Sequence, residues 1–148
     1  MGAPRIFLDT SAIFTGIWSA IGGARLILNL GEAGALQVVI SQQVLHELED
    51  VLYRKAPAAL VTLARLLDRI QVEIALPGSE AHSQQCLAST EHPGDARVLA
   101  DAWSAGVEYL VSLNQKHILN NPEVRSHLPF QVGTPGDFLQ FYRDKFVE

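Results

Sequence analysis

The sequence predicts a three-layer α/β/α sandwich with a mainly parallel central sheet. Segments typical of strands alternate with segments typical of helices, which favours a parallel sheet covered by helices on both faces. The strand segments around Phe7 and Val39 are nearly continuous apolar runs, as expected where both faces of a strand are covered. No internal repeat or linker interrupts the pattern, so residues 1–148 are expected to form a single domain.

Five short segments have the composition and the boundaries of strands. They lie at residues 5–9, 37–41, 71–76, 109–112 and 131–134. Each lies close to a proline or a glycine, which is typical of the ends of strands. In a parallel sheet, ligands bind outside the carboxyl ends of the strands. Polar residues at those ends are therefore the first candidates for a functional site.

Helical patterns lie between the strand segments. The predicted helices span residues 24–32, 44–54, 57–69, 95–105 and 137–145. Leucine, isoleucine and valine recur at helical spacing in the first three of them. Pro57 suits the first turn of its helix, and Gly34 and Gly106 lie just beyond the ends of theirs. Allowing for short helices, the expected order is β-α-β-α-α-β-α-β-α-β-α.

The composition indicates a folded cytoplasmic protein and limits its partners. Hydrophobic residues make up 48% and charged residues 18% of the chain, which is enough apolar material for one core. The single cysteine, Cys86, allows no intrachain disulfide, and we find neither a signal peptide nor a membrane-spanning run. The net charge of −5 argues against a general nucleic-acid coat protein, yet an acidic metal site is compatible with it.

Two aspartates are the strongest candidates for chemistry. Asp9 closes the first strand segment, where a ligand is expected, although it would equally suit an N-cap of the segment that follows. Asp95 lies on the same side of its helix as Val98 and Leu99, so it should face the interior, where an ionised carboxylate needs a partner. A helix N-cap is the alternative interpretation of Asp95. Asp101 points to the opposite side and is expected to be solvated.

Glu47 follows the second strand segment and borders the apolar stripe of its helix. Periodicity alone does not choose Glu47 over Glu49, and an exposed acid near a helix N-terminus is the simpler interpretation. Carboxylates that converge repel one another, by roughly 4 kcal/mol for a pair about 4 Å apart at an effective dielectric near 20. A cation relieves that repulsion, and oxygen ligands favour Mg²⁺ or Mn²⁺ over Zn²⁺. Such ions promote attack of water on a phosphodiester.

Four segments, in this order, resemble the PIN-domain family of metal-dependent nucleases. They are RIFLDTSAIF, SQQVLHELEDVL, HPGDARVLADAWSAGVEYLVSLNQKHI and TPGDFLQFY. The resemblance extends over almost the whole chain and implies a PIN-like fold. It also implies that Asp9, Glu47 and Asp95 are catalytic ligands of Mg²⁺ or Mn²⁺, directly or through water. Ser11 matches the small hydroxyl residue that often follows the first acid, and is expected to support the site or contact the substrate.

The activity that this resemblance implies is endoribonuclease, the hydrolysis of RNA phosphodiester bonds. In the family, this activity often belongs to the toxin of a toxin–antitoxin pair, so the implied partners are RNA, an antitoxin protein and a second copy of the chain. No residue of the sequence itself indicates an antitoxin. Lys116, in the loop after the fourth strand segment, is the best candidate for contact with the RNA backbone.

The five histidines invite a zinc site, but their positions argue against one. They are scattered along the chain and show no paired ligand spacing, and Cys86 has no cysteine partner. We therefore expect unrelated surface or loop histidines at 46, 82, 92, 117 and 127. His117 is the one histidine for which a contact with the substrate is an alternative, because it follows Asn114 closely.

Asn114 departs from the family pattern at a position that often carries an aspartate. Its amide oxygen could still orient a bound water, so it is placed with the catalytic residues, but one negative charge is lost. Two alternatives stay open. The chain could be a catalytically weakened domain that binds RNA or protein, or a phosphatase that forms an aspartyl-phosphate on Asp9. Ser11 stands where such phosphatases carry their second acid.

Overall fold

The computed structural model describes residues 2–90 and 92–147, and within them the sheet has five parallel strands. The strands are β1 (Arg5–Leu8), β2 (Gln37–Ser41), β3 (Glu73–Ala75), β4 (Tyr109–Val111) and β5 (Gln131–Gly133). Their order across the sheet is β3-β2-β1-β4-β5, and every pairing between neighbours is parallel. The predicted sheet is therefore confirmed, and it is wholly rather than mainly parallel.

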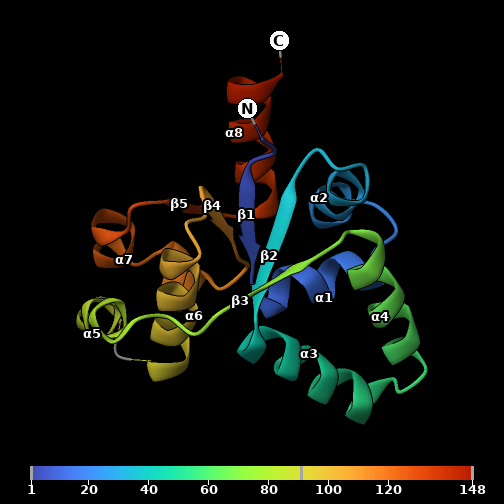
Figure 1. Cartoon of the computed structure of the whole chain (residues 1–148), viewed down its shortest axis with the longest axis horizontal. Coiled ribbons are helices and arrows are strands. Elements are labelled where there is room, and N and C mark those ends of the chain that lie inside the picture. Colours follow the sequence, from blue (N-terminus) through green and yellow to red (C-terminus); the bar gives the residue numbers. More distant parts are fainter. Residues whose placement is uncertain (1, 91, 148) are drawn as a thin grey trace.

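Helices cover both faces of this sheet. They are α1 (Thr10–Trp18), α2 (Gly23–Glu32), α3 (Gln42–Lys55), α4 (Ala59–Arg69), α5 (Glu80–Ser89), α6 (Pro93–Ser104), the π-helix η1 (Gln115–Leu119), α7 (Pro122–His127) and α8 (Pro135–Phe146). Figure 1 shows α5, α6 and α7 on one side of the sheet and α1, α2 and α4 on the other. Helix α8 packs against α2 and against β4 and β5. The three-layer sandwich is thus confirmed.

The five predicted strands and the five predicted helices are all present, with ends within two residues of the prediction. No bounds were predicted for α1, α5, α7 and η1. Helix α5 carries only one fully buried side chain, that of Cys86, so it has no apolar stripe that periodicity could reveal. Helix α7 and η1 are too short for such a stripe.

The strand order places β1 at the centre of the sheet and opens a crevice at its carboxyl end. The chain adds β2 and β3 on one side of β1, then crosses the sheet and adds β4 and β5 on the other. In open parallel sheets, ligands bind at this reversal, outside the carboxyl ends of the strands. Asp9 continues directly from β1, and its backbone N–H donates to the carbonyl oxygen of Val111 at 3.2 Å. The ends of β1 and β4 are therefore held side by side.

The central strands are buried on both faces by apolar side chains, as their sequences predict. The fully buried residues of β1 and β2 include Ile6, Phe7, Val38, Val39 and Ile40.

None of the helices within the described residues is by itself long and apolar enough to cross a membrane. Helices α1 and α2 meet the criteria of length and composition only as a pair, which is bent by 92° at the break between them.

Asp101 is buried, and the prediction that it is solvated was wrong. Its side chain is 6% exposed, and its Oδ1 accepts a hydrogen bond from the backbone N–H of Gly78 at 2.6 Å. Burial raises the pKa of Asp101, and the hydrogen bond from Gly78 opposes that shift. The segment between β3 and α5 covers this side of α6, which the helical period alone could not reveal. This contact fixes the position of α6, the helix that carries Asp95.

Replacing Gly78 with alanine tests how closely this segment packs. A Cβ at position 78 would lie 2.7 Å from the carbonyl carbon and oxygen of Ala100, which belong to helix backbone and cannot turn aside. We expect Gly78→Ala to lower the free energy of unfolding by about 1–3 kcal/mol, measured by urea denaturation. Gly136→Ala is the matched control, because the nearest atom to its Cβ lies at 3.8 Å. Equal stability of the two variants would contradict this packing.

Candidate metal centre

A cavity of about 240 Å³ lies at the carboxyl ends of β1 and β4, where the strand order reverses. The residues that line it are Asp9, Thr10, Ser11, Gln43, Glu47, Gly94, Asp95, Val98, Asn114 and Ile118. They come from the start of α1, from α3, from the start of α6 and from the turn that leads into η1. Segments far apart in the sequence therefore meet at one opening.

Asp9 is the most buried of the acids in this group and accepts the most hydrogen bonds. It is 8% exposed, and its Oδ1 accepts hydrogen bonds from the Ser11 hydroxyl at 2.7 Å and from the backbone N–H of Ala12 at 3.0 Å. Its Oδ2 accepts a hydrogen bond from the fully buried hydroxyl of Ser112. Asp9 also caps α1, so the two sequence-based interpretations of this residue are compatible.

Burial raises the pKa of Asp9 above its ordinary value. The hydrogen bonds from Ser112, Ser11 and Ala12 oppose this shift, and the negative charge of Glu47 adds to it. Without a cation nearby, the ionised form of Asp9 is thus unfavourable, because Asp9 is buried and lies near another carboxylate. A cation in the cavity would reverse that cost.

The structure distinguishes Glu47 from Glu49. Glu47 lines the cavity, whereas Glu49 does not. The Oε2 of Glu47 accepts a hydrogen bond from the Thr10 hydroxyl at 2.8 Å, and its Oε1 accepts one from the Gln43 amide at 3.0 Å. The same amide donates to the carbonyl oxygen of Gly94 at 3.3 Å. An exposed glutamate on α3 is thereby oriented toward the first turn of α6.

Asp95 lies in the first turn of α6 and faces Asn114. His92 occupies the N-cap position of α6, without a side-chain cap hydrogen bond, so the interpretation of Asp95 as the N-cap was wrong. The Asn114 amide donates to the Oδ1 of Asp95 at 3.4 Å, and its own Oδ1 accepts from the backbone N–H of His117 at 3.2 Å. Asn114 therefore caps η1 and contacts an acid at the same time.

The turn after β4 is connected to the hydroxyls that hold Asp9. The backbone N–H of Leu113 donates to the Ser11 hydroxyl at 3.1 Å, and that of Asn114 donates to the Ser112 hydroxyl at 2.9 Å. Because each hydroxyl both donates to Asp9 and accepts from the turn, Asp9 and Asn114 are held in one hydrogen-bond network. Ser112, Thr10 and Gln43 were not predicted from the sequence. Thr10 and Ser112 do lie just beyond the ends of β1 and β4, which was the one available signal.

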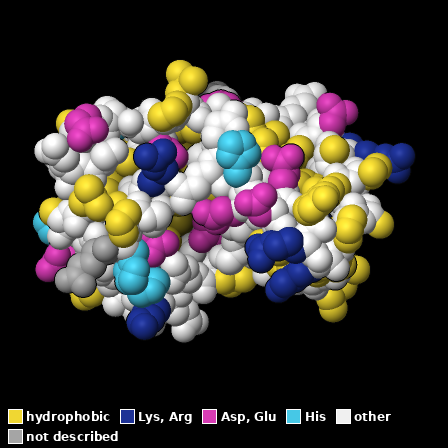
Figure 2. All heavy atoms as spheres, turned by 90° about the horizontal axis from the view of Figure 1, so that it is seen from below, with side chains coloured by type: hydrophobic (Ala, Val, Ile, Leu, Met, Phe, Trp, Pro, Cys, Tyr) yellow, Lys and Arg dark blue, Asp and Glu magenta, His cyan; other side chains and the backbone are white. Residues whose placement is uncertain are grey.

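The donors around the cavity suit a hard divalent cation. The lining includes three carboxylates, from Asp9, Glu47 and Asp95, and among the described residues it contains no lysine, arginine or histidine. Oxygen donors of this kind favour Mg²⁺ or Mn²⁺. Figure 2, which looks at the molecule from below relative to Figure 1, shows acidic side chains gathered at the middle of this face. The residues present therefore fit the cation that the sequence led us to expect.

Three further residues lie next to the cavity rather than in it. Lys116 lines a neighbouring groove together with His92 and His117. The expectation that the histidines are unrelated was wrong for these two. They lie beside Asp95, and one ligand atom from each of the three residues falls within 4.8 Å of the others.

The fold is similar to those of three solved structures at low sequence identity. One is VapBC2 from Rickettsia felis, which was solved bound to a DNA fragment from its promoter. It has a TM-score of 0.66 and 17% identity, and the match covers 86% of this chain and 96% of that one. PAE2754 from Pyrobaculum aerophilum has a TM-score of 0.57 and 14% identity, and the match covers 95% of this chain and 92% of that one. VapC20 from Mycobacterium tuberculosis, a Sarcin-Ricin loop cleaving toxin, has a TM-score of 0.51 and 20% identity, over 75% and 91%.

The sequence comparisons are more specific. No curated protein matches the chain at a significant level. A sequence model of the PIN domain, however, matches residues 5–116, which make up most of the chain and include β1, β2, β3 and β4. The matched segment contains Asp9, Glu47 and Asp95. On this match, the chain belongs to the PIN-domain family.

Proposed function

We propose that this chain, acting as one domain over residues 1–148, is an endoribonuclease that depends on Mg²⁺ or Mn²⁺. The observation that carries the proposal is the convergence of Asp9, Glu47 and Asp95 on one cavity at the reversal of the sheet. Membership of the PIN-domain family supports it. The aspartyl-phosphate hypothesis has less support, because Ser11 stands where such phosphatases carry their second acid.

Each protein group has a distinct part in this reaction. A bound cation supplies positive charge against the phosphodiester and the acidity that lets a water attack it at neutral pH. Asp9 provides the most rigid anchor for the cation, since three donors fix its two oxygens. Glu47 is oriented by Thr10 and Gln43. Asn114 holds Asp95 through its amide group and leaves its own oxygen on η1.

The RNA contacts have to come from local basic groups, because the chain as a whole carries a net charge of −5. Lys116 is the group we propose for this contact, since it lines the groove adjacent to the cavity. Ser11 lines the cavity itself, where it supports Asp9 and lies within reach of a bound substrate. Phosphate contacts of this kind fix the position of the strand without selecting its sequence.

We further propose that the activity is that of a toxin with an antitoxin partner, and that the chain forms a homodimer. The fold shared with VapBC2 and with the Sarcin-Ricin loop cleaving toxin VapC20 supports the toxin role and the antitoxin partner. The homodimer rests on the family resemblance alone. A second candidate function is a weakened domain that binds RNA or protein without cutting. Asn114 favours it, because an amide stands where the family often carries an acid.

An RNA cleavage assay with Mn²⁺ separates these two functions. Glu47→Gln, Asp9→Asn and Asp95→Asn each remove one cavity carboxylate while nearly preserving its shape. Loss of cation stabilisation worth several kcal/mol should slow cleavage by roughly a hundredfold or more in each variant. Glu49→Gln is the matched control for Glu47→Gln, because both residues are exposed on α3 and only Glu47 lines the cavity. It should cleave as the unmodified chain does.

Two results would overturn the enzyme proposal. Equal activity in all variants would mean that a contaminating nuclease does the cutting. No cleavage by the unmodified chain, together with Mn²⁺ binding to Asp9 and Asp95, would favour the binding domain instead.

Asn114→Asp tests whether position 114 belongs to the cation site. The substitution adds a fourth negative charge beside Asp95 and keeps an oxygen that can cap η1. Repulsion between the two carboxylates should lower the melting temperature without cation, and Mn²⁺ should bind more tightly than to the unmodified chain. Calorimetry with Mn²⁺ and no RNA measures this. Unchanged or weaker binding would place Asn114 outside the site.

A further inference from the structure

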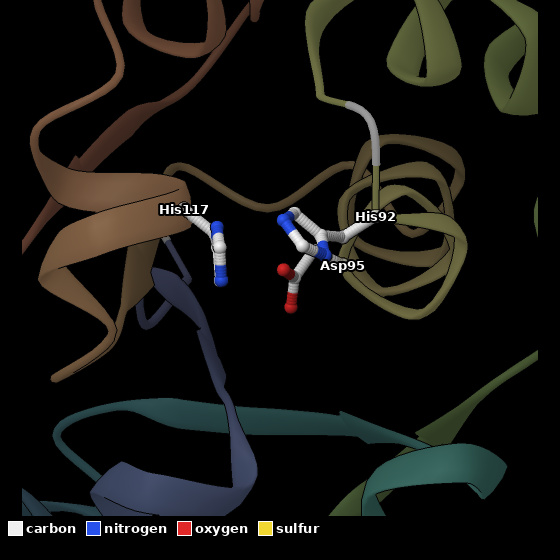
Figure 3. A group of neighbouring side chains, drawn as sticks. All are labelled: His92, Asp95 and His117. Atoms are coloured by element: carbon white, nitrogen blue, oxygen red, sulfur yellow. The ribbon is translucent and has the colours of Figure 1, made fainter.

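His92, Asp95 and His117 form a compact group at the rim of the cavity. Figure 3 shows the His117 ring projecting from η1 toward His92 and Asp95, which lie at the beginning of α6. One ligand atom from each of the three lies within 4.8 Å of the other two. His92 and Asp95 are three positions apart at the start of one helix, so they share a face.

The two imidazole rings are unusually close and have no other visible role. Their centroids lie 3.6 Å apart with the planes tilted by 47°, whereas aromatic pairs usually sit about 4.5–7 Å apart. Within the described part of the chain, both histidines donate through backbone N–H groups, and no hydrogen bond involves their ring nitrogens. The nitrogens are therefore available as ligands, and Asp95 is the acid that faces them.

Two imidazole nitrogens and one carboxylate oxygen suit a different class of metal from the oxygen-lined cavity. Imidazole favours zinc, copper, iron and nickel, whereas carboxylate and carbonyl oxygens favour magnesium and manganese. Zinc sites with three protein ligands leave one position for water or substrate. The two histidines also line a groove of about 580 Å³, which leaves room for such a fourth ligand.

We propose that His92, Asp95 and His117 form a site for a borderline divalent metal such as Zn²⁺, adjacent to the oxygen-lined cavity and sharing Asp95 with it. The site supplies nitrogen donors close to Asn114, where the negative charge of an aspartate is absent. Zinc binding itself stands independently of nuclease activity. Only the coupling of the two sites through Asp95 rests on the proposed function.

Calorimetry with Zn²⁺ on the full chain, prepared without a polyhistidine tag and without RNA, tests the site. His92→Ala and His117→Ala should each weaken Zn²⁺ binding by roughly tenfold or more, since each removes a direct ligand. His127→Ala is the matched control, because His127 is exposed and lies outside the group. It should leave the affinity unchanged. Co²⁺ in place of Zn²⁺ should give a visible absorption spectrum that changes in the two ligand variants alone.

Asp9→Asn and Glu47→Gln distinguish the new site from the cavity. Both should keep Zn²⁺ affinity while weakening Mn²⁺ binding, whereas Asp95→Asn should weaken both metals. Zinc binding that survives both histidine substitutions, or that is lost in Asp9→Asn but not in His92→Ala, would overturn the proposal. His92→Gln and His117→Gln replace any alanine variant that fails to show a cooperative thermal transition. RNA cleavage with Mn²⁺ alone reports separately on the nuclease proposal.

Discussion

The repulsion between carboxylates at the carboxyl end of β1 is the constraint on which the site depends. Asp9 is nearly buried, its pKa is raised by burial, and Glu47 raises it further. Asp95 adds a third acid to the same cavity, whose lining contains no basic side chain. Such a group is unfavourable unless a cation occupies it or a proton neutralises one of its members. The chain keeps these acids together in a place where a divalent ion is the natural partner.

The fold holds the acids in place through the parallel sheet and through hydrogen bonds from neighbouring serine hydroxyls. The parallel order β3-β2-β1-β4-β5 brings the ends of β1 and β4 together, so Asp9 and Asn114 face the same opening. Ser11 and Ser112 hold Asp9 and at the same time accept from the turn after β4. Asp101 and Gly78 fix α6 from its other side. The acids are therefore oriented before any ligand arrives, which lowers the cost of binding.

Much of this arrangement could be predicted from the sequence. The apolar runs and the alternation of elements gave the sheet and its layers, and Asp9 was expected at a strand end. Periodicity could not choose between Glu47 and Glu49, because both border the apolar stripe of α3. The family resemblance favoured Glu47, and the structure places Glu47 at the cavity. Asp101 was misjudged because its helical face is covered by a loop that has no periodic pattern. His92 and His117 meet only because η1 turns the second toward the first.

The proposed site places a divalent ion between Asp9 and Asp95. A crystal soaked in Mn²⁺, with anomalous scattering recorded to locate the ion, tests this most directly. We expect a peak inside the cavity at the end of β1, within coordinating distance of both aspartates or of waters bound to them. A peak elsewhere on the surface, with the cavity filled by water alone, would contradict it.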